Sequence, residues 1–133
     1  MAAPLERLKR RSEFLRVAAS RRKFVTPGLI LQALSRPGES DGGAIRVGFT
    51  ASRKVGIAVE RNRARRRLRA AVASVLPGLG KAGSDYVVIA RAETVRRPYA
   101  DLVNDLATAL RRIEERRGEA RPRVAANAAS ARA

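Results

Sequence analysis

The sequence contains neither cysteine nor histidine. Without cysteine, the chain has no disulfide framework, no thiolate zinc site and no thiol nucleophile. Without histidine, it lacks the most common general base and the most common metal ligand. A hydrolytic triad of the usual kind is excluded, and we expect no catalytic residue in the protein itself. The lack of cysteine is consistent with a cytoplasmic protein, which is the location we expect.

Long apolar runs are also absent. No segment approaches the roughly 20 residues of a membrane-spanning helix. The stretch "KRRSEFL" resembles a twin-arginine export signal, but Arg16, Arg21 and Arg22 interrupt the apolar region that should follow. We therefore expect neither export nor a membrane partner.

Aromatic residues are few. There are five in total, namely Phe14, Phe24, Phe49, Tyr86 and Tyr99. Proteins that bind single-stranded nucleic acid usually stack bases on aromatic rings, so the stacking signal is weak. The sequence leaves open whether Phe14 belongs to the core or reaches over an open face of the sheet.

Positive charge is in large excess. Lys and Arg number 29 against 12 Asp and Glu, which gives a net charge of +17 in 133 residues. Solubility does not require such a charge, and it indicates a polyanionic partner. Asp101 and Asp105 lie four residues apart and could in principle bind a metal ion. The better explanation is that negative charge near a helix N-terminus is stabilised by the helix dipole. We predict no metal site in the protein.

The densest charge lies in residues 52–75, "SRKVGIAVERNRARRRLRAAVASV". At 100° per residue, one narrow apolar stripe forms from Ala64, Leu68, Ala71, Val72 and Val75. Arginines cover the remaining surface, and Glu60 is the only acid in the stretch. The apolar stripe predicts that this helix packs on a protein core. A basic face exposed only to solvent would normally carry acids spaced for i,i+4 pairs, so the unpaired arginines indicate binding to phosphates.

The periodicity predicts an α+β domain with a small four-stranded mixed sheet and helices packed on it. The predicted strands are residues 24–25, 29–35, 45–52 and 86–90, and the predicted helices are residues 13–19, 59–76 and 98–118. The order strand, arginine helix, strand indicates that strands 45–52 and 86–90 are parallel. We predict a basic N-terminal arm at 1–11, one domain at 12–118 that binds nucleic acid and a disordered tail at 119–133.

The segment 47–71, "VGFTASRKVGIAVERNRARRRLRAA", resembles the signature of the bacterial ribonuclease P protein component. That family carries an ordered VG-x-x-x-S-[KR]-K-[VI]-G-x-AV-x-RNR pattern. The segments "LKRRSEFLRV", "PGLILQAL" and "DYVVIARAETVRRPYADLVNDL" match other parts of the family in the same order. The resemblance covers residues 8–117.

The resemblance implies a left-handed crossover through the arginine helix, although parallel crossovers are nearly always right-handed. It also implies an endonuclease whose RNA subunit is the catalyst and which removes the 5′ leader of precursor tRNA. Mg²⁺ would be held mainly by RNA. The expected partners are ribonuclease P RNA, in a 1:1 complex, and precursor tRNA.

Two sets of residues carry over by position. The set expected to bind the catalytic RNA is Ser52, Arg53, Lys54, Arg61, Asn62, Arg63, Arg65, Arg66, Arg67 and Arg69. The set expected to form the cleft for the tRNA leader is Phe14, Ile30, Gln32, Arg46, Thr50 and Arg91. The chain departs from the family at Ala18 and Gln32, where aromatic residues are frequent, and at Ile57, where Asn or Lys is usual. The cleft should therefore depend less on stacking and more on charge.

A structural RNA-binding protein of the ribosome or of its assembly is the alternative. Composition alone does not separate the two, because both need a small basic domain without catalytic side chains. A protein that binds anionic membranes would need large apolar residues opposite the basic ones, where this helix has Ala and Val.

Overall fold

The computed structural model describes residues 4–36, 38 and 43–130, and side chains as far as residue 115. Predictions for residues 1–3 and 131–133 lie outside the described residues. In chain order the elements are β1 (Leu5–Arg7), α1 (Arg11–Ala19), β2 (Lys23–Val25), β3 (Leu29–Ser35), β4 (Ile45–Thr50), α2 (Ala58–Leu79), β5 (Ser84–Ala90), the 3-10 turn η1 (Ala92–Thr94) and α3 (Tyr99–Ser130).

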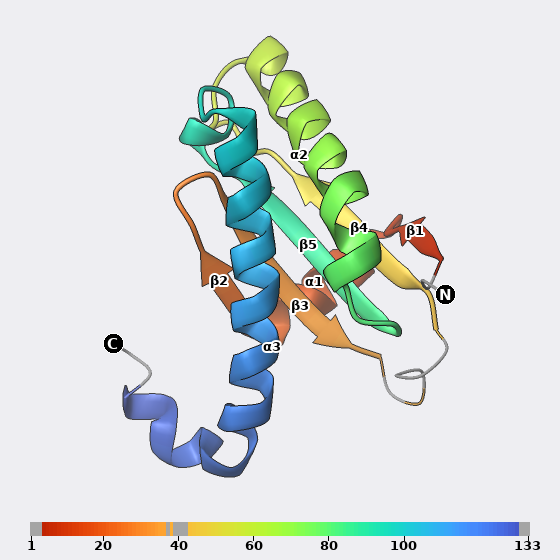
Figure 1. Cartoon of the computed structure of the whole chain (residues 1–133), viewed down its shortest axis with the longest axis vertical. Helices are drawn as coiled ribbons and strands as arrows, with labels where there is room; N and C mark the ends of the chain where they lie inside the picture. The colour runs from red at the N-terminus through yellow and green to blue at the C-terminus, as the bar shows by residue number, and fades with distance from the viewer. Residues whose placement is uncertain (1–3, 37, 39–42, 131–133) are drawn as a thin grey trace.

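The strands form one mixed sheet in the order β1-β4-β5-β3-β2. β4 and β5 are parallel, with Val47 opposite Tyr86, which confirms the parallel pair predicted across the arginine helix. β3 is antiparallel to both β5 and β2. The connection from β4 through α2 to β5 passes in front of the sheet in Figure 1 and is left-handed, as the resemblance implies.

The sheet has five strands, so the prediction of four was wrong by one. The additional strand is β1, within the segment predicted to be a basic arm, and it pairs in parallel with β4. The Ile45 N–H donates to the Pro4 carbonyl and the Leu8 N–H donates to the Val47 carbonyl. Three exposed residues carry no alternation of apolar and polar side chains, so only the neighbouring strand makes this segment a strand.

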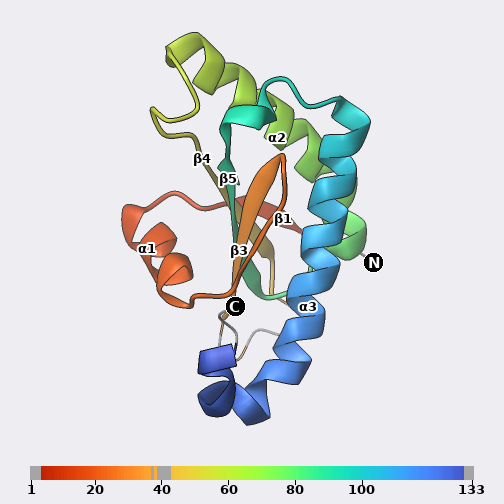
Figure 2. The same ribbon diagram turned by 90° about the vertical axis from the view of Figure 1, so that its left-hand side faces the viewer.

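Helices α2 and α3 cover one face of the sheet (Figure 2). The predicted stripe of α2 is confirmed, because Ala64, Leu68, Ala71, Val72 and Val75 are all buried. They pack with the inner faces of β3, β4 and β5 and with an apolar stripe of α3. α2 extends past its predicted end at residue 76 and includes Pro77. Proline destabilises the helix little at this position, because only one backbone hydrogen bond near the last turn is lost.

Helix α1 covers the opposite face of the sheet (Figure 2). A second, smaller core forms there from Leu8, Val17 and Val87, with Phe14 packed against it. The helix begins at Arg11, before the predicted start, because the Glu13 carboxylate accepts hydrogen bonds from the Lys9 and Arg10 N–H groups, both at 3.0 Å. The acid therefore caps the helix from within its first turn.

Helix α3 continues beyond the predicted end at Gly118. Its backbone is helical to Ser130, within the segment predicted to be a disordered tail, and the ribbon changes direction toward its end in Figure 1. The segment is rich in Ala and Arg, which are among the best helix formers, and it contains Pro122, a residue type that kinks helices.

Candidate RNA-binding surfaces

The first candidate surface is one flank of α2. Arg61, Asn62, Arg65, Arg66 and Arg69 lie on the side of this helix that faces β4 and β1, as their spacing along the helix requires. Asn62, Arg66 and Arg69 are exposed, and Arg65 is half-buried with its Nη1 donating to Asn62 Oδ1 at 2.9 Å. We call these five residues the α2 basic flank. The guanidinium groups of its four arginines present forks of N–H donors that suit phosphate oxygens.

Two predicted RNA-binding arginines have backbone partners within the protein. Arg67 lies on the other flank of α2, where its Nη1 donates to the Val95 carbonyl at 2.8 Å and its Nη2 to the Arg97 carbonyl. Arg61 donates from Nη1 to the Gly56 carbonyl at 2.9 Å. Arg67 therefore ties α2 to the loop before α3, and sequence spacing does not distinguish it from its exposed neighbours.

The turn before α2 presents the next predicted group, Ser52, Arg53 and Lys54, and all three are exposed. The turn is closed by the Lys54 N–H, which donates to Ser52 Oγ at 3.3 Å. Gly56 has φ +148°, and a Cβ at this position would overlap the Glu60 carboxylate that caps α2 at Ile57. Glycine is therefore required to bring this basic turn against the start of the helix.

The second candidate surface is the face of the sheet that bears α1. Ile30, Gln32, Arg46 and Thr50 all point to this face and are half-buried, as their alternation along β3 and β4 predicts. Phe14 lies over Gly48, where a side chain would overlap its ring, so the glycine makes room for the aromatic. Phe14 is half-buried, so it both packs on the second core and borders this surface.

Arg46 is held by two acids. Its Nε and Nη2 donate to Asp85 Oδ1 and Oδ2 at 2.8 and 2.9 Å, and its Nη1 donates to Glu13 Oε2 at 3.1 Å. Asp85 is 1% exposed and also accepts from Arg36 Nη1 at 2.6 Å. The positive charge of Arg46, which the resemblance assigned to the leader cleft, is thus largely balanced by these carboxylates. Because Arg46 and Asp85 lie 39 positions apart, sequence reasoning missed this role of Asp85.

Glu13 connects α1 to this ion-pair network. Hydrogen bonds from the Arg10 and Lys9 N–H groups lower the pKa of Glu13 below its ordinary value of 4.5, and the nearby Arg46 charge adds to the effect. The carboxylate is therefore charged at neutral pH and fastens the start of α1 to β4.

Arg91 lies just after β5, and its Nη1 donates to the Thr26 carbonyl at 2.7 Å. Nearby, Asp105 is buried and accepts from Arg97 Nε at 2.6 Å and from the Gly28 N–H at 3.0 Å. This explains Asp105 as a link between α3 and the turn before β3. Within the described residues, no three His, Cys, Asp or Glu side chains lie together as a candidate metal site.

Over the part of the chain that the structure describes, no helix is both long and apolar enough to cross a membrane. The two surfaces lie on opposite sides of the sheet, with the α2 basic flank on one side and the α1 face on the other. The sheet therefore carries two separate candidate surfaces, one on each side.

Comparison with known proteins gives a consistent result. The family model for ribonuclease P matches residues 3–114. The ribonuclease P protein component of Paramagnetospirillum magneticum is 60% identical over 114 residues, which cover 85% of this chain and 86% of that protein. The corresponding protein of Ruegeria pomeroyi is 50% identical over 108 residues, covering 80% and 84%.

Solved structures show the same fold. The RNase P protein of Thermotoga maritima has a TM-score of 0.66 at 24% identity, over 80% of this chain and 96% of that one. The Staphylococcus aureus RNase P protein has a TM-score of 0.65 at 23% identity, over 79% and 92%. Since the family model spans most of the sequence and close relatives match along nearly their whole length, this chain belongs to the ribonuclease P protein family.

Proposed function

We propose that this chain is the protein subunit of ribonuclease P and assists removal of the 5′ leader from precursor tRNA. The observation that carries the proposal is the pair of opposite surfaces on one small sheet. The α2 basic flank, with the turn Ser52 to Lys54, binds the RNA subunit. The α1 face, bordered by Phe14 and floored by Ile30, Gln32 and Thr50, binds the leader.

The chemistry belongs to the RNA subunit in this proposal. The chain has no histidine or cysteine. Asp85 and Asp105 accept hydrogen bonds from arginines, and within the described residues no three acids are grouped for a metal ion. Mg²⁺ is accordingly held mainly by RNA. The protein contributes binding and orientation, as one copy per RNA subunit, in the cytoplasm where the tRNA precursors are made.

A cleavage assay tests the proposal. Precursor tRNA is incubated with a bacterial ribonuclease P RNA at low Mg²⁺, with and without this protein. The expected result is accurate 5′ cleavage that requires both components and does not occur with protein alone. If the protein binds the RNA and leaves cleavage unchanged, the α2 basic flank binds RNA without a role in cleavage. The alternative, a structural RNA-binding protein of the ribosome or of its assembly, is then favoured.

A further inference from the structure

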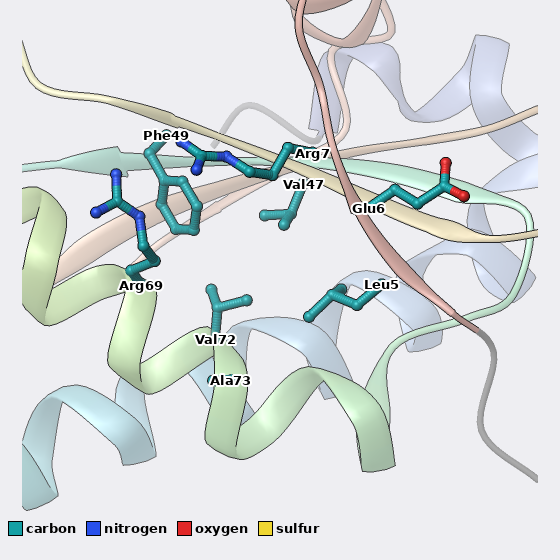
Figure 3. A pocket seen from close by; sticks show the side chains of 8 residues that line it. All are labelled: Leu5, Glu6, Arg7, Val47, Phe49, Arg69, Val72 and Ala73. Atoms are coloured by element: carbon teal, nitrogen blue, oxygen red, sulfur yellow. The ribbon is translucent and has the colours of Figure 1, made fainter.

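A hollow of about 150 Å³ lies between β1, β4 and α2 (Figure 3). Its wall is largely apolar and comes from Leu5 of β1, Val47 and Phe49 of β4, and Val72 and Ala73 of α2. Leu5 is 40% exposed, so the hollow opens toward solvent along β1. Apolar cavities of about 150 Å³ are large enough to bind benzene, so a single six-membered ring fits this space.

Two arginines border the same hollow. The guanidinium carbon of Arg69 lies 5.7 Å from the centre of the Phe49 ring, a cation–π arrangement. Arg7 contributes a second guanidinium at the Phe49 end, whereas the carboxylate of Glu6 points away from the hollow (Figure 3). An apolar slot for a ring therefore adjoins two groups that bind phosphate.

The hollow is continuous with the α2 basic flank, because Arg69 belongs to both. An RNA strand whose phosphates follow Arg65, Arg66 and Arg69 passes the mouth of the hollow. The α1 face, to which we assign the leader, lies on the other side of the sheet. An RNA strand bound there does not reach the hollow. The α2 basic flank, the Phe49 ring and the adjoining hollow together supply the positive charge and the aromatic surface that proteins use to bind unpaired bases.

We propose that this hollow binds one unpaired pyrimidine base of the ribonuclease P RNA, with Arg69 and Arg7 on the adjacent phosphates. The inference rests on the proposed function for the identity of the RNA. The ring lies against Phe49 and Val72, and its polar edge faces the solvent opening beside Leu5, where water can satisfy it.

Two variants of the protein test the inference. Ala73→Leu fills the hollow from an exposed helical position without removing a charge. Ser74→Leu adds a side chain of the same size at the neighbouring exposed position, which does not line the hollow. Thermal unfolding checks that both variants fold. Affinity for a bacterial ribonuclease P RNA is then measured, and we expect about a tenfold loss for Ala73→Leu but less than about a twofold change for Ser74→Leu.

A second measurement separates base binding from phosphate binding. Methyl NMR signals of Leu5, Val47 and Val72 are followed while oligouridylate, or an abasic RNA of the same length, is added to the wild-type protein. We expect oligouridylate to shift these signals, the abasic RNA to leave them in place, and Ala73→Leu to abolish the shift.

Equal RNA affinity of the two variants, or equal methyl shifts with the abasic RNA, would overturn the inference while leaving the proposed function intact. Conversely, a wild-type protein that binds ribonuclease P RNA no better than an unrelated RNA of similar length contradicts the proposed function. The oligouridylate result then still decides whether the hollow takes a base.

Discussion

Arg46 and Asp85 lie opposite each other on the parallel strands β4 and β5 and share two hydrogen bonds, at 2.8 and 2.9 Å. The pair lies on the face of the sheet that carries α1, and Glu13 extends it to that helix. Arg46 therefore holds β4, β5 and α1 together on this face. A phosphate reaches this guanidinium only by competing with two carboxylates that are already in place.

Removal of the Asp85 charge should destabilise the protein. In the Asp85→Asn variant, Arg36 and Arg46 face one another without the buried carboxylate, and breaking such a pair typically costs about 3 kcal/mol. Urea unfolding measures the change in the free energy of unfolding. Glu115→Gln, at an exposed position of α3, is the matched control and should change stability by less than about 0.5 kcal/mol. Equal stabilities of the two variants would mean that the buried charge is not needed.

Glu13 should make stability depend on pH in the acidic range. Its pKa is lowered in the folded state, so the carboxylate stabilises the protein above its unfolded pKa near 4.5, and this contribution is lost as pH falls through the folded pKa. We expect Glu13→Gln to cost about 1 kcal/mol near neutral pH, with a gap to wild type that narrows below pH 4.5. Thermal unfolding across pH measures it, with exposed Glu6→Gln as control. A gap independent of pH would assign the loss to packing.

The two flanks of α2 should respond differently to substitution. Arg66→Ala removes an exposed guanidinium and should weaken RNA binding, reducing the salt slope by about one unit with little effect on stability. Arg67→Ala removes the donors to Val95 and Arg97 and should lower the free energy of unfolding by about 1–2 kcal/mol. Binding titrations over a range of salt, together with urea unfolding, compare the two. The assignment fails if Arg67→Ala alters the salt slope and leaves stability unchanged.

The Arg65 and Arg69 side chains also belong to the α2 basic flank, so each Ala variant should lower RNA affinity for all sequences. The expected decrease in the salt slope is about one unit per lost phosphate contact. An unchanged slope for either variant would show that the residue does not touch the RNA backbone.

Phe14 should affect recognition of the leader rather than of the RNA subunit. Because the ring also packs over Gly48, Phe14→Leu is preferable to Ala: it keeps apolar contact and removes the aromatic face. Loss of one stacked base should reduce the preference for precursor over mature tRNA by about fivefold. Affinities of the assembled enzyme for both tRNAs measure this, and equal losses for the two would remove Phe14 from the leader surface.

Local sequence patterns were sufficient to predict much of the fold and the family of this protein. The stripe on α2, the alternation along β3 and β4, and the ordered motif around Arg61-Asn62-Arg63 are properties of residues close in sequence. Helix and strand periods convert such patterns directly into faces. For that reason the arginine helix, the parallel strand pair and the family were all accessible from the sequence.

Tertiary structure decided the rest. β1 is a strand only because β4 lies beside it, and the sequence around Leu5 to Arg7 has no strand pattern of its own. Spacing makes Arg66 and Arg67 look alike, but only Arg67 meets carbonyls of the loop before α3. The sequence around Arg46 shows no acidic partner for it. The register of β4 against β5 brings Asp85 opposite Arg46, and the two side chains form hydrogen bonds. Periodicity tells which side of an element a residue occupies, whereas the partner on that side depends on how distant elements pack.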